Sequence, residues 1–481
     1  MISNASLQQI HHCDMIGSLH TNKRRAKSEE CRISCLPPEL LALIFILAQA
    51  ESKSNRHPLS SNTPFEVNLS HVSRRWRAVS LTTRTLWNQI DIYTPLSLHL
   101  ASSYLERSGP QILLDIHIDL LEWEQHRITG DFSESLTALD IIQSIGDHII
   151  PHLYRIRSLL FTCFCESTCL NMLLILRNAS APNLRQLEIK FDYWPFVPML
   201  RNRLSRFRIL QHGSSQLAFF KTDQAECMPV ITSLRGLTSL HLGKLHTDMF
   251  LTYPTLVEVL TAPDCLLYLS IEGAISRSIW PRHFNAPDFQ LHHLKALRIC
   301  DQRTSMPATL LLTMSAPKLE SLWLECNFKN LVYLSWPTLG PSRFPKPRYL
   351  TLSGVNPPFV VPLCTMFLNT THLHLHRVDV QYFRDLESTL SGPWSSLHTL
   401  IFTTVIGDLE VNWENIGHLM TSRLPRHLSR GRLINNLLVD RDILHVFEKE
   451  VPSPIETKVQ LVSKENYMEP WWNQEDQPNA E

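Results

Sequence analysis

One short apolar pattern recurs along most of the chain and constrains its fold more than any other feature. The pattern is L-x-x-L-x-L, with Ile, Phe, Pro or Thr at some of the three apolar positions. Successive copies begin 23 to 29 residues apart, except for one gap of 53 residues, which is about two periods. A period of this length predicts a stack of similar units, each contributing one short strand. The nine copies are Ile156–Phe161, Leu184–Ile189, Leu237–Leu242, Leu266–Ile271, Leu294–Ile299, Leu319–Leu324, Pro347–Leu352, Thr370–Leu375 and Leu397–Phe402.

Alternation within each copy predicts which side chains are buried. Neighbouring strand residues point to opposite faces, so the Leu and Ile positions would point inward and stack on the adjacent units. The residues between them would face outward on a concave surface. The pattern and its period resemble leucine-rich repeats, which implies an α/β solenoid shaped like a horseshoe. The asparagine that usually follows the strand in that family is mostly missing here, so we expect an irregular arc.

The solenoid is expected to cover residues 93–430. It would open with a helix near 95–107, followed by an alternating strand over Ile112–Ile118. The 53-residue gap between copies leaves room for one more unit. A degenerate copy at Leu204–Ile209 is the candidate for it.

Both ends of the chain differ from the repeats. Residues 1–33 are polar, with a short basic cluster at Lys23–Arg25, and predict a disordered tail; a nuclear-import signal is the alternative. Residues 431–481 are interpreted as a C-terminal cap and tail. Within them we expect a capping helix over Leu433–Phe447 and a loose acidic end over Glu465–Glu481.

A run of nine apolar residues, Leu40–Ala48, begins the ordered part of the chain. Pro38 suits the first position of a helix, and Glu39 suits the positive end of the helix dipole, so the run predicts a helix that is apolar on all sides. Such a helix must be covered. A second apolar helical face follows, made of Leu69, Val72, Trp76 and Val79. These short helices are too small to cover the first, so a partner protein is the expected cover.

Over residues 34–92 the chain resembles the F-box. The resemblance rests on Leu-Pro-Pro-Glu-Leu-Leu-x-x-Ile-Phe at 36–45, Val-Ser-Arg-Arg-Trp-Arg at 72–77 and Leu-Trp at 86–87. The long polar insert after the first helix is similar to F-box proteins of mushroom-forming fungi. That family docks on a Skp-family adaptor and, through it, on a cullin. By position, the resemblance implies that the adaptor-binding residues are Leu36, Pro37, Leu40, Ile44, Phe45, Val72 and Trp76. An ordinary helical cap on the solenoid is the structural alternative.

The resemblance implies the substrate-recognition subunit of an SCF-type (cullin–RING) ubiquitin ligase, a receptor that is not itself an enzyme. The concave face of the repeats would bind an unknown target protein, because large aromatic side chains on a scaffold strand are typical anchors for protein recognition. The alternative is a protein-interaction scaffold outside any ligase, which would use the same surface. The candidate target-binding residues are Tyr268, Arg298, Trp323, Tyr349 and His374, with Lys190 and His241 also facing outward.

Three clusters invite a chemical interpretation, and each also has a structural one that we favour. A cysteine triplet lacks a second pair at zinc-ligand spacing, so buried structural thiols are expected. Three alternating histidines predict a polar surface strand, with a partner contact or a metal site as alternatives. Four arginines could bind a phosphate, but the net charge of the chain is zero, so a solvated basic surface is favoured. The clusters are Cys163, Cys165 and Cys169; His372, His374 and His376; and Arg201, Arg203, Arg206 and Arg208.

Composition and motifs argue against several function classes. Lys+Arg and Asp+Glu both number 45, so the net charge is zero, and neither nucleic acid nor a membrane is an expected partner. The longest apolar run is nine residues, whereas a membrane span needs about twenty. The sequence contains no dinucleotide, P-loop, nucleophile-elbow or zinc-protease motif, so we expect no catalytic residues, metal or cofactor. Eleven scattered cysteines indicate reduced thiols in the cytoplasm, the nucleus or both.

Overall fold

The computed structural model is a mixed α/β protein, which confirms the predicted fold class at that level. It consists of two compact units: a smaller one of residues 1–90 and 99–112, and a larger one of residues 91–98 and 113–481. The structure describes residues 33–54, 63–94, 97–121, 138–163, 166–191, 209–223, 234–243, 252–273, 289–301, 306–326, 343–354, 363, 366–379, 396–406, 436–440 and 458–462. None of the helices in these ranges is long and apolar enough to cross a membrane.

The smaller unit is helical. Its first long helix, α2, begins at Pro38 with Glu39 in the first turn, as the sequence predicts. The core of the unit contains Phe45 of α2 and Trp87, whose indole Nε1 donates to the carbonyl of Ser80 at 2.8 Å. The elements are η1 (Ile33–Cys35), α2 (Pro38–Ser54), α3 (Phe65–Val72), α4 (Arg74–Thr82), η2 (Arg84–Trp87) and most of α5 (Ser97–Ser108).

The second apolar stretch of this unit forms two helices where the sequence pattern predicts one face. The chain is extended at Ser73 (φ −159°, ψ 163°), which ends α3 and begins α4. The Ser73 hydroxyl accepts a hydrogen bond from the backbone N–H of Trp76 at 3.1 Å, the standard N-cap interaction. The break changes the direction of the chain. Leu69 and Val79 are therefore buried, whereas Val72 is 59% exposed.

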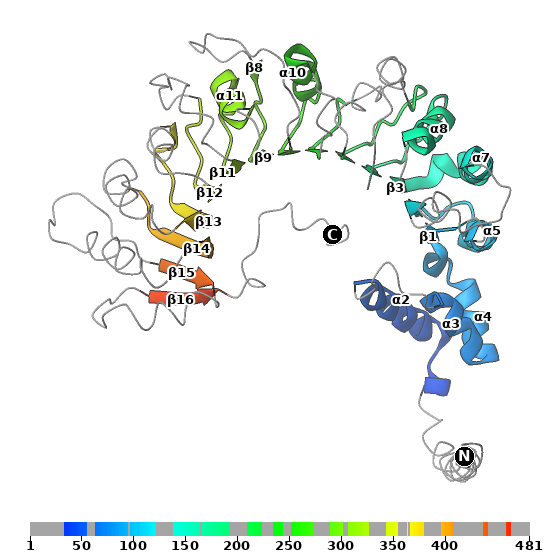
Figure 1. Ribbon diagram of the computed structural model, residues 1–481. Coiled ribbons are helices and arrows are strands. Elements are labelled where there is room, and N and C mark those ends of the chain that lie inside the picture. Colours follow the sequence, from blue (N-terminus) through cyan, green and yellow to red (C-terminus); the bar gives the residue numbers. More distant parts are fainter. Residues whose placement is uncertain are drawn as a thin grey trace, which may run out of the picture. The chain divides into compact units, whose positions relative to one another are not determined.

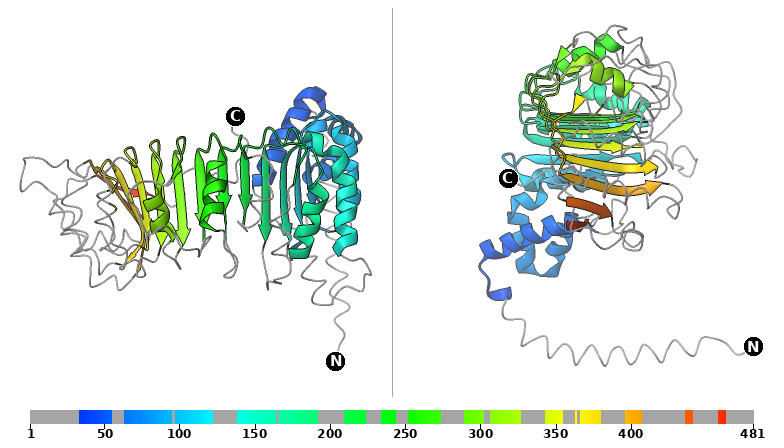
Figure 2. Two further views of the ribbon diagram at one scale, coloured as in Figure 1. Left: turned by 90° about the horizontal axis from the view of Figure 1, so that it is seen from above. Right: turned by 90° about the vertical axis from the view of Figure 1, so that its left-hand side faces the viewer.

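The larger unit is built on a parallel sheet. Fourteen strands follow in chain order, with β8 and β10 in a separate two-stranded sheet. All pairs from β2 to β16 in the large sheet are parallel. The strands lie side by side (Figure 2). Their bounds are β1 (Gln89–Ile92), β2 (Leu114–Asp119), β3 (Ile156–Cys163), β4 (Gln186–Phe191), β5 (Phe219–Thr222), β6 (Ser239–Leu242), β7 (Tyr268–Glu272), β8 (Phe289–Gln290), β9 (Ala296–Asp301), β10 (Met314–Ser315), β11 (Ser321–Cys326), β12 (Tyr349–Ser353), β13 (His372–Asp379), β14 (Thr399–Ile406), β15 (Asn436–Asp440) and β16 (Lys458–Val462).

The helices of the larger unit lie on one side of this sheet (Figure 1). They are α7 (Ala138–Ile149), η3 (Ile150–Arg155), α8 (Glu166–Leu176), α10 (Tyr253–Thr261) and α11 (Met306–Thr313). Leucines pair across adjacent strands in unbroken rows, as in Leu297–Leu322–Leu350–Leu373–Leu400, and each of these five is almost completely buried. Stacked leucines thus form the continuous core that the repeat pattern predicts.

Each of the nine copies contains the start of a strand. The additional unit expected in the 53-residue gap is present, but at a different position from the one predicted. The strand between β4 and β6 is β5, which follows the pattern Leu217-x-x-Phe220-x-Thr222. The proposed copy at Leu204–Ile209 lies largely outside the described residues. Phe220 and Thr222 replace the usual leucines at two positions, which hid this copy in the sequence.

The prediction that the repeat rhythm ends near residue 430 is wrong. Strand β15 lies inside Leu433–Phe447, where a capping helix was expected, and β16 follows it. Both extend the sheet in the same register, with Leu437 paired to Leu400 and to Val459. A short apolar run does not by itself distinguish a strand from a helix. Here the run pairs with the edge of β14 and is therefore a strand.

Candidate functional site

The first helix of the smaller unit has two apolar faces, and only one of them is buried. Leu41 and Phe45 are each 1% exposed and point into the unit. The opposite face is open, and its side chains follow the i, i+3, i+4, i+7 spacing of one helix face. We name it the α2 stripe; it consists of Leu40, Leu43, Ile44 and Leu47, which are 47–62% exposed.

The predicted adaptor-binding residues separate into exposed and buried members. Leu40 and Ile44 lie in the α2 stripe, Pro37 is exposed, and Leu36 is half-buried. For Phe45 the expectation of an accessible side chain is wrong, because its ring packs on the half-buried ring of Trp76 at 4.9 Å.

Three other exposed apolar side chains bear on the predicted contacts, and two of them belong to the α2 stripe. Val72, a predicted adaptor-binding residue, is largely exposed, because α3 ends at this residue and the chain is extended at Ser73. Leu43 and Leu47 were not among the predicted contacts, although the helical spacing from Leu40 identifies both. An exposed apolar helix face of this kind fits into an apolar groove of another protein, with residues i, i+3, i+4 and i+7 as anchors.

A buried polar cluster lies behind α2 in the same unit. The Gln49 side-chain amide donates to Glu66 Oε2 at 2.9 Å and to the carbonyl of Leu86 at 2.9 Å. The Tyr104 hydroxyl donates to Glu66 Oε1. Gln49, Glu66 and Tyr104 are all at most 5% exposed. The Gln49 side chain therefore joins α2 to α3 and η2 by hydrogen bonds in the core, and Glu66 joins this cluster to α5.

The second candidate surface is the face of the large sheet that lies away from α7, α8, α10 and α11 (Figure 1). We name it the inner sheet face. Arg298, Trp323 and His374 occupy one row across β9, β11 and β13, with Thr351 of β12 between the last two. Tyr268 and Tyr349 begin their strands on the same face. The strand pairing agrees with the predicted register for Tyr268, Arg298, Trp323, Tyr349 and His374.

The exposure of these side chains differs from the prediction. Tyr349 is 47% exposed, and Tyr268 and Arg298 are half-buried. Trp323 and His374, expected at the surface, are only 7% and 4% exposed. Strands about 4.8 Å apart bring neighbouring side chains into contact on the same face, so large residues cover one another. The Arg298 guanidinium lies 5.4 Å from the centre of the Trp323 ring, and the His374 ring lies 6.4 Å from it.

Charged groups gather on the strands nearer the start of the sheet. Glu188 Oε1 lies 3.0 Å from Lys190 Nζ and 3.5 Å from Lys221 Nζ. His241, one strand beyond Lys221, is buried, and burial together with the Lys221 ammonium lowers the pKa of its imidazole to about 3. Glu188 opposes this shift but does not overcome it. His241 is therefore neutral at physiological pH, and this end of the face carries a compact ion-pair network.

The histidine strand forms ring contacts. The Tyr349 and His372 rings are 4.6 Å apart, and burial followed by the neighbouring His398 lowers the pKa of His372. Burial and His376 lower the pKa of His374 to about 3. Within the described part of the chain, no three His, Cys, Asp or Glu side chains are placed to hold a metal ion. These rings form an aromatic cluster in which the buried His374 imidazole is neutral.

The remaining predicted clusters contribute little to a site. Cys163 and Cys169 are buried free thiols, in agreement with the structural interpretation, and the Cys163 thiol contacts the carbonyl of Lys190 at 3.7 Å. Cys165 and the arginine group at 201–208 lie outside the described residues.

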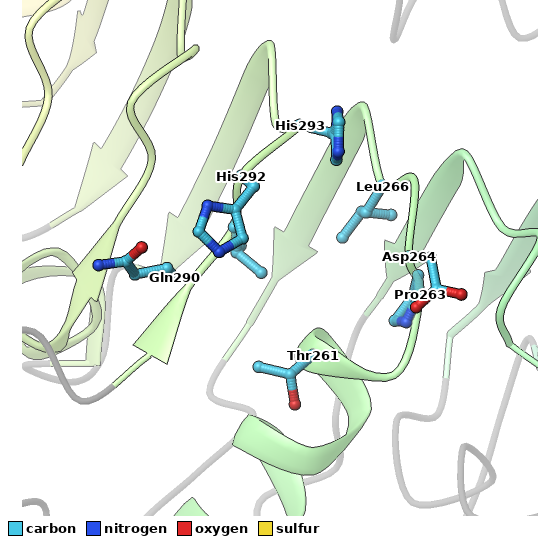
Figure 3. Close-up of a pocket in the computed structure, with 8 residues that line it drawn as sticks. Thr261, Pro263, Asp264, Leu266, Gln290, His292 and His293 are labelled. Atoms are coloured by element: carbon cyan, nitrogen blue, oxygen red, sulfur yellow. The ribbon is translucent and has the colours of Figure 1, made fainter.

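A hollow of about 160 Å³ lies between α10 and the turn before β9 (Figure 3). Its polar lining includes His292, His293 and Asp264, all exposed, with His292 and Asp264 on opposite sides of the hollow. Binding sites usually fix a ligand with polar groups that are partly withdrawn from water. The hollow therefore has the character of a surface depression.

No protein-family model matches this chain, and no curated protein shows significant similarity to it. The α2 stripe and the inner sheet face are thus the observations from which a function can be proposed. The first is apolar and unpaired within its unit; the second is a row of aromatic, basic and neutral imidazole side chains.

Proposed function

We propose that this chain is the substrate-recognition subunit of an SCF-type (cullin–RING) ubiquitin ligase. In this proposal the helical unit is an F-box that binds a Skp-family adaptor, and the parallel sheet belongs to an irregular leucine-rich-repeat solenoid that binds a target protein. The ligase chemistry belongs to other subunits. The receptor acts by holding the target near them, which raises the effective concentration of its lysines at the reaction centre. The expected location is the cytoplasm or the nucleus.

The observation that carries the proposal is the α2 stripe. Four large aliphatic side chains on one face of one helix are about half exposed or more. Scattered surface leucines are ordinary, but a continuous apolar row along a helix favours a protein partner. The same residues lie within the segment whose motifs resemble the F-box.

The proposed target surface is the inner sheet face, through the exposed ring of Tyr349 and the half-buried Tyr268 and Arg298. Aromatic and arginine side chains are the types that contribute most to protein interfaces. Trp323 and His374 support this surface from below by packing against Arg298 and one another. An interaction scaffold outside any ligase would use the same face.

The test is capture of a purified Skp-family adaptor by the full-length chain. We expect wild type to bind, and the Ile44→Asp/Leu47→Asp variant to lose binding by about a hundredfold, because two charges would enter an apolar groove. Leu139→Asp is the matched control, since Leu139 is 55% exposed on α7 of the other unit. Failure of the wild type to bind the adaptor would overturn the ligase proposal and leave the scaffold alternative.

A further inference from the structure

Helix α2 buries the less apolar of its two faces. Its outward face carries the four aliphatic residues of the α2 stripe, whereas its inward face carries Leu41, Phe45 and the polar Gln49. Residues of a helix are 100° apart around its axis, so these two faces are nearly opposite. A half-turn of α2 about its own axis would exchange them. Apolar burial alone would favour that exchanged orientation.

The hydrogen bonds behind α2 oppose this rotation. We name Gln49, Glu66 and Tyr104 the Gln49 latch. Both oxygens of the buried Glu66 carboxyl accept a hydrogen bond, one from Gln49 and one from Tyr104, and the Gln49 amide also reaches the Leu86 carbonyl. In the observed orientation each of these three acceptors therefore has a donor.

Rotation of α2 would remove the Gln49 amide from this cluster. Glu66 Oε2 would then lose its donor from Gln49 while its side chain, 4% exposed, remained in the core. A buried acceptor without a donor is strongly unfavourable, more so for a carboxyl group. The contact between Phe45 and Trp76 adds shape complementarity in the same direction. In some proteins, buried polar groups select one arrangement among several of similar apolar burial, and the proposal assigns that role to this cluster.

We infer that the Gln49 latch is a positioning element that fixes the rotation of α2 and thereby keeps the α2 stripe facing outward. The identity of the partner that uses the stripe rests on the proposed function. The rotation itself is a property of this chain alone, so it can be tested without any partner.

The test measures which face of α2 is accessible. Ile44→Cys reports the outward face and Leu41→Cys the inward face, each introduced into the full-length chain and followed by maleimide labelling and peptide mass mapping. With the latch intact we expect Ile44→Cys to react about a hundredfold faster than Leu41→Cys, because the inward position reacts only through opening of the unit. In the triple variant Gln49→Leu/Glu66→Leu/Tyr104→Phe, apolar side chains replace the latch. There we expect the ratio of the two labelling rates, Ile44→Cys over Leu41→Cys, to fall by about tenfold or more.

Two further variants keep the test decisive. Glu66→Gln preserves the shape of the latch: its amide oxygen can accept from Gln49 and its amide N–H can donate to the Tyr104 hydroxyl, so the labelling ratio should stay within about twofold of wild type. Gln49→Met removes only the amide donors at similar length and should lower the ratio even if the triple variant fails to fold. An unchanged ratio in Gln49→Met, or in a folded triple variant, would overturn the inference.

Adaptor capture by the same proteins separates this inference from the proposed function. If the latch variants change the labelling ratio and lose adaptor binding, both are supported. If the ratio changes while wild type binds no adaptor, the positioning role is supported and the ligase proposal fails. If the ratio is unchanged while wild type binds the adaptor, the positioning role fails and the ligase proposal is unaffected.

Discussion

Neighbouring residues on α2 should respond very differently to truncation. Phe45 is 1% exposed and packs on Trp76, so Phe45→Ala should destabilise the smaller unit by about 3–4 kcal/mol. Ile44 is 47% exposed, so Ile44→Ala removes only about half of the apolar burial that the same truncation would remove at a fully buried isoleucine. Alanine also forms helices better than isoleucine, which leaves a net loss of about 1 kcal/mol or less for Ile44→Ala.

Hydrogen exchange of peptides from α2 and α4 measures both changes locally, without assuming that the whole chain unfolds in one step. Because 1.4 kcal/mol is a factor of ten, Phe45→Ala should accelerate exchange there by several hundredfold, and Ile44→Ala by about fivefold at most. In adaptor capture the order should reverse for folded protein, with Ile44→Ala weakening binding by about tenfold. Equal acceleration of exchange by the two variants would refute the assignment of inward and outward faces.

Three further outcomes follow from local contacts. Ser73→Ala removes the cap that bonds the N–H of Trp76 and should destabilise α4 by about 1 kcal/mol; Ser73→Asp should restore exchange protection, and equal protection in all three proteins would disprove the capping role. His374 has a pKa of about 3 in the folded chain against 6.5 ordinarily, so below pH 6.5 the unfolded chain binds the proton first. Stability of the larger unit should therefore fall with decreasing pH toward 3, by at most about 1.4 kcal/mol per pH unit from this group, and His374→Gln should reduce that slope in urea unfolding. Burial raises the pKa of the Cys300 thiol to about 12, so at pH 8 iodoacetamide should modify exposed Cys35 at least about a hundredfold faster; comparable rates would contradict the burial of Cys300.

Nine strands of the large sheet were predictable from the sequence because a short local pattern defines each of them. Every L-x-x-L-x-L copy places its last two apolar residues in a strand, and the parallel register keeps those residues in line from unit to unit. The start of α2 was predictable from Pro38 and Glu39 for a similar local reason. Features that depend on three or four consecutive residues are well determined at this level.

The elements that the sequence did not reveal depend on weaker or competing signals. In β5 the pattern contains Phe220 and Thr222, which a search for leucine spacing passes over. The apolar spacing from Leu69 to Val79 continues across Ser73, although a serine is a good N-cap and breaks the helix there. In β15 the short apolar run suits a helix or a strand equally well until the edge of β14 is present.

The candidate sites were predictable in register but not in exposure. Alternation placed Arg298, Trp323 and His374 on the inner sheet face correctly. Their burial depends on side chains from neighbouring strands, whose spacing no single segment encodes. Similarly, the choice between the two apolar faces of α2 depends on Gln49 bonding to Glu66, which is 17 residues away in the chain.

In the large sheet each strand pairs only with the strands next to it in chain order. Among the described strands, no pairing joins the first strand of the sheet to the last. A pulling force on the chain therefore meets no single set of long-range hydrogen bonds that must break before the rest. A sheet connected in this way, held at its two ends and pulled, should yield one strand at a time from an edge, with many small force peaks in place of a single rupture.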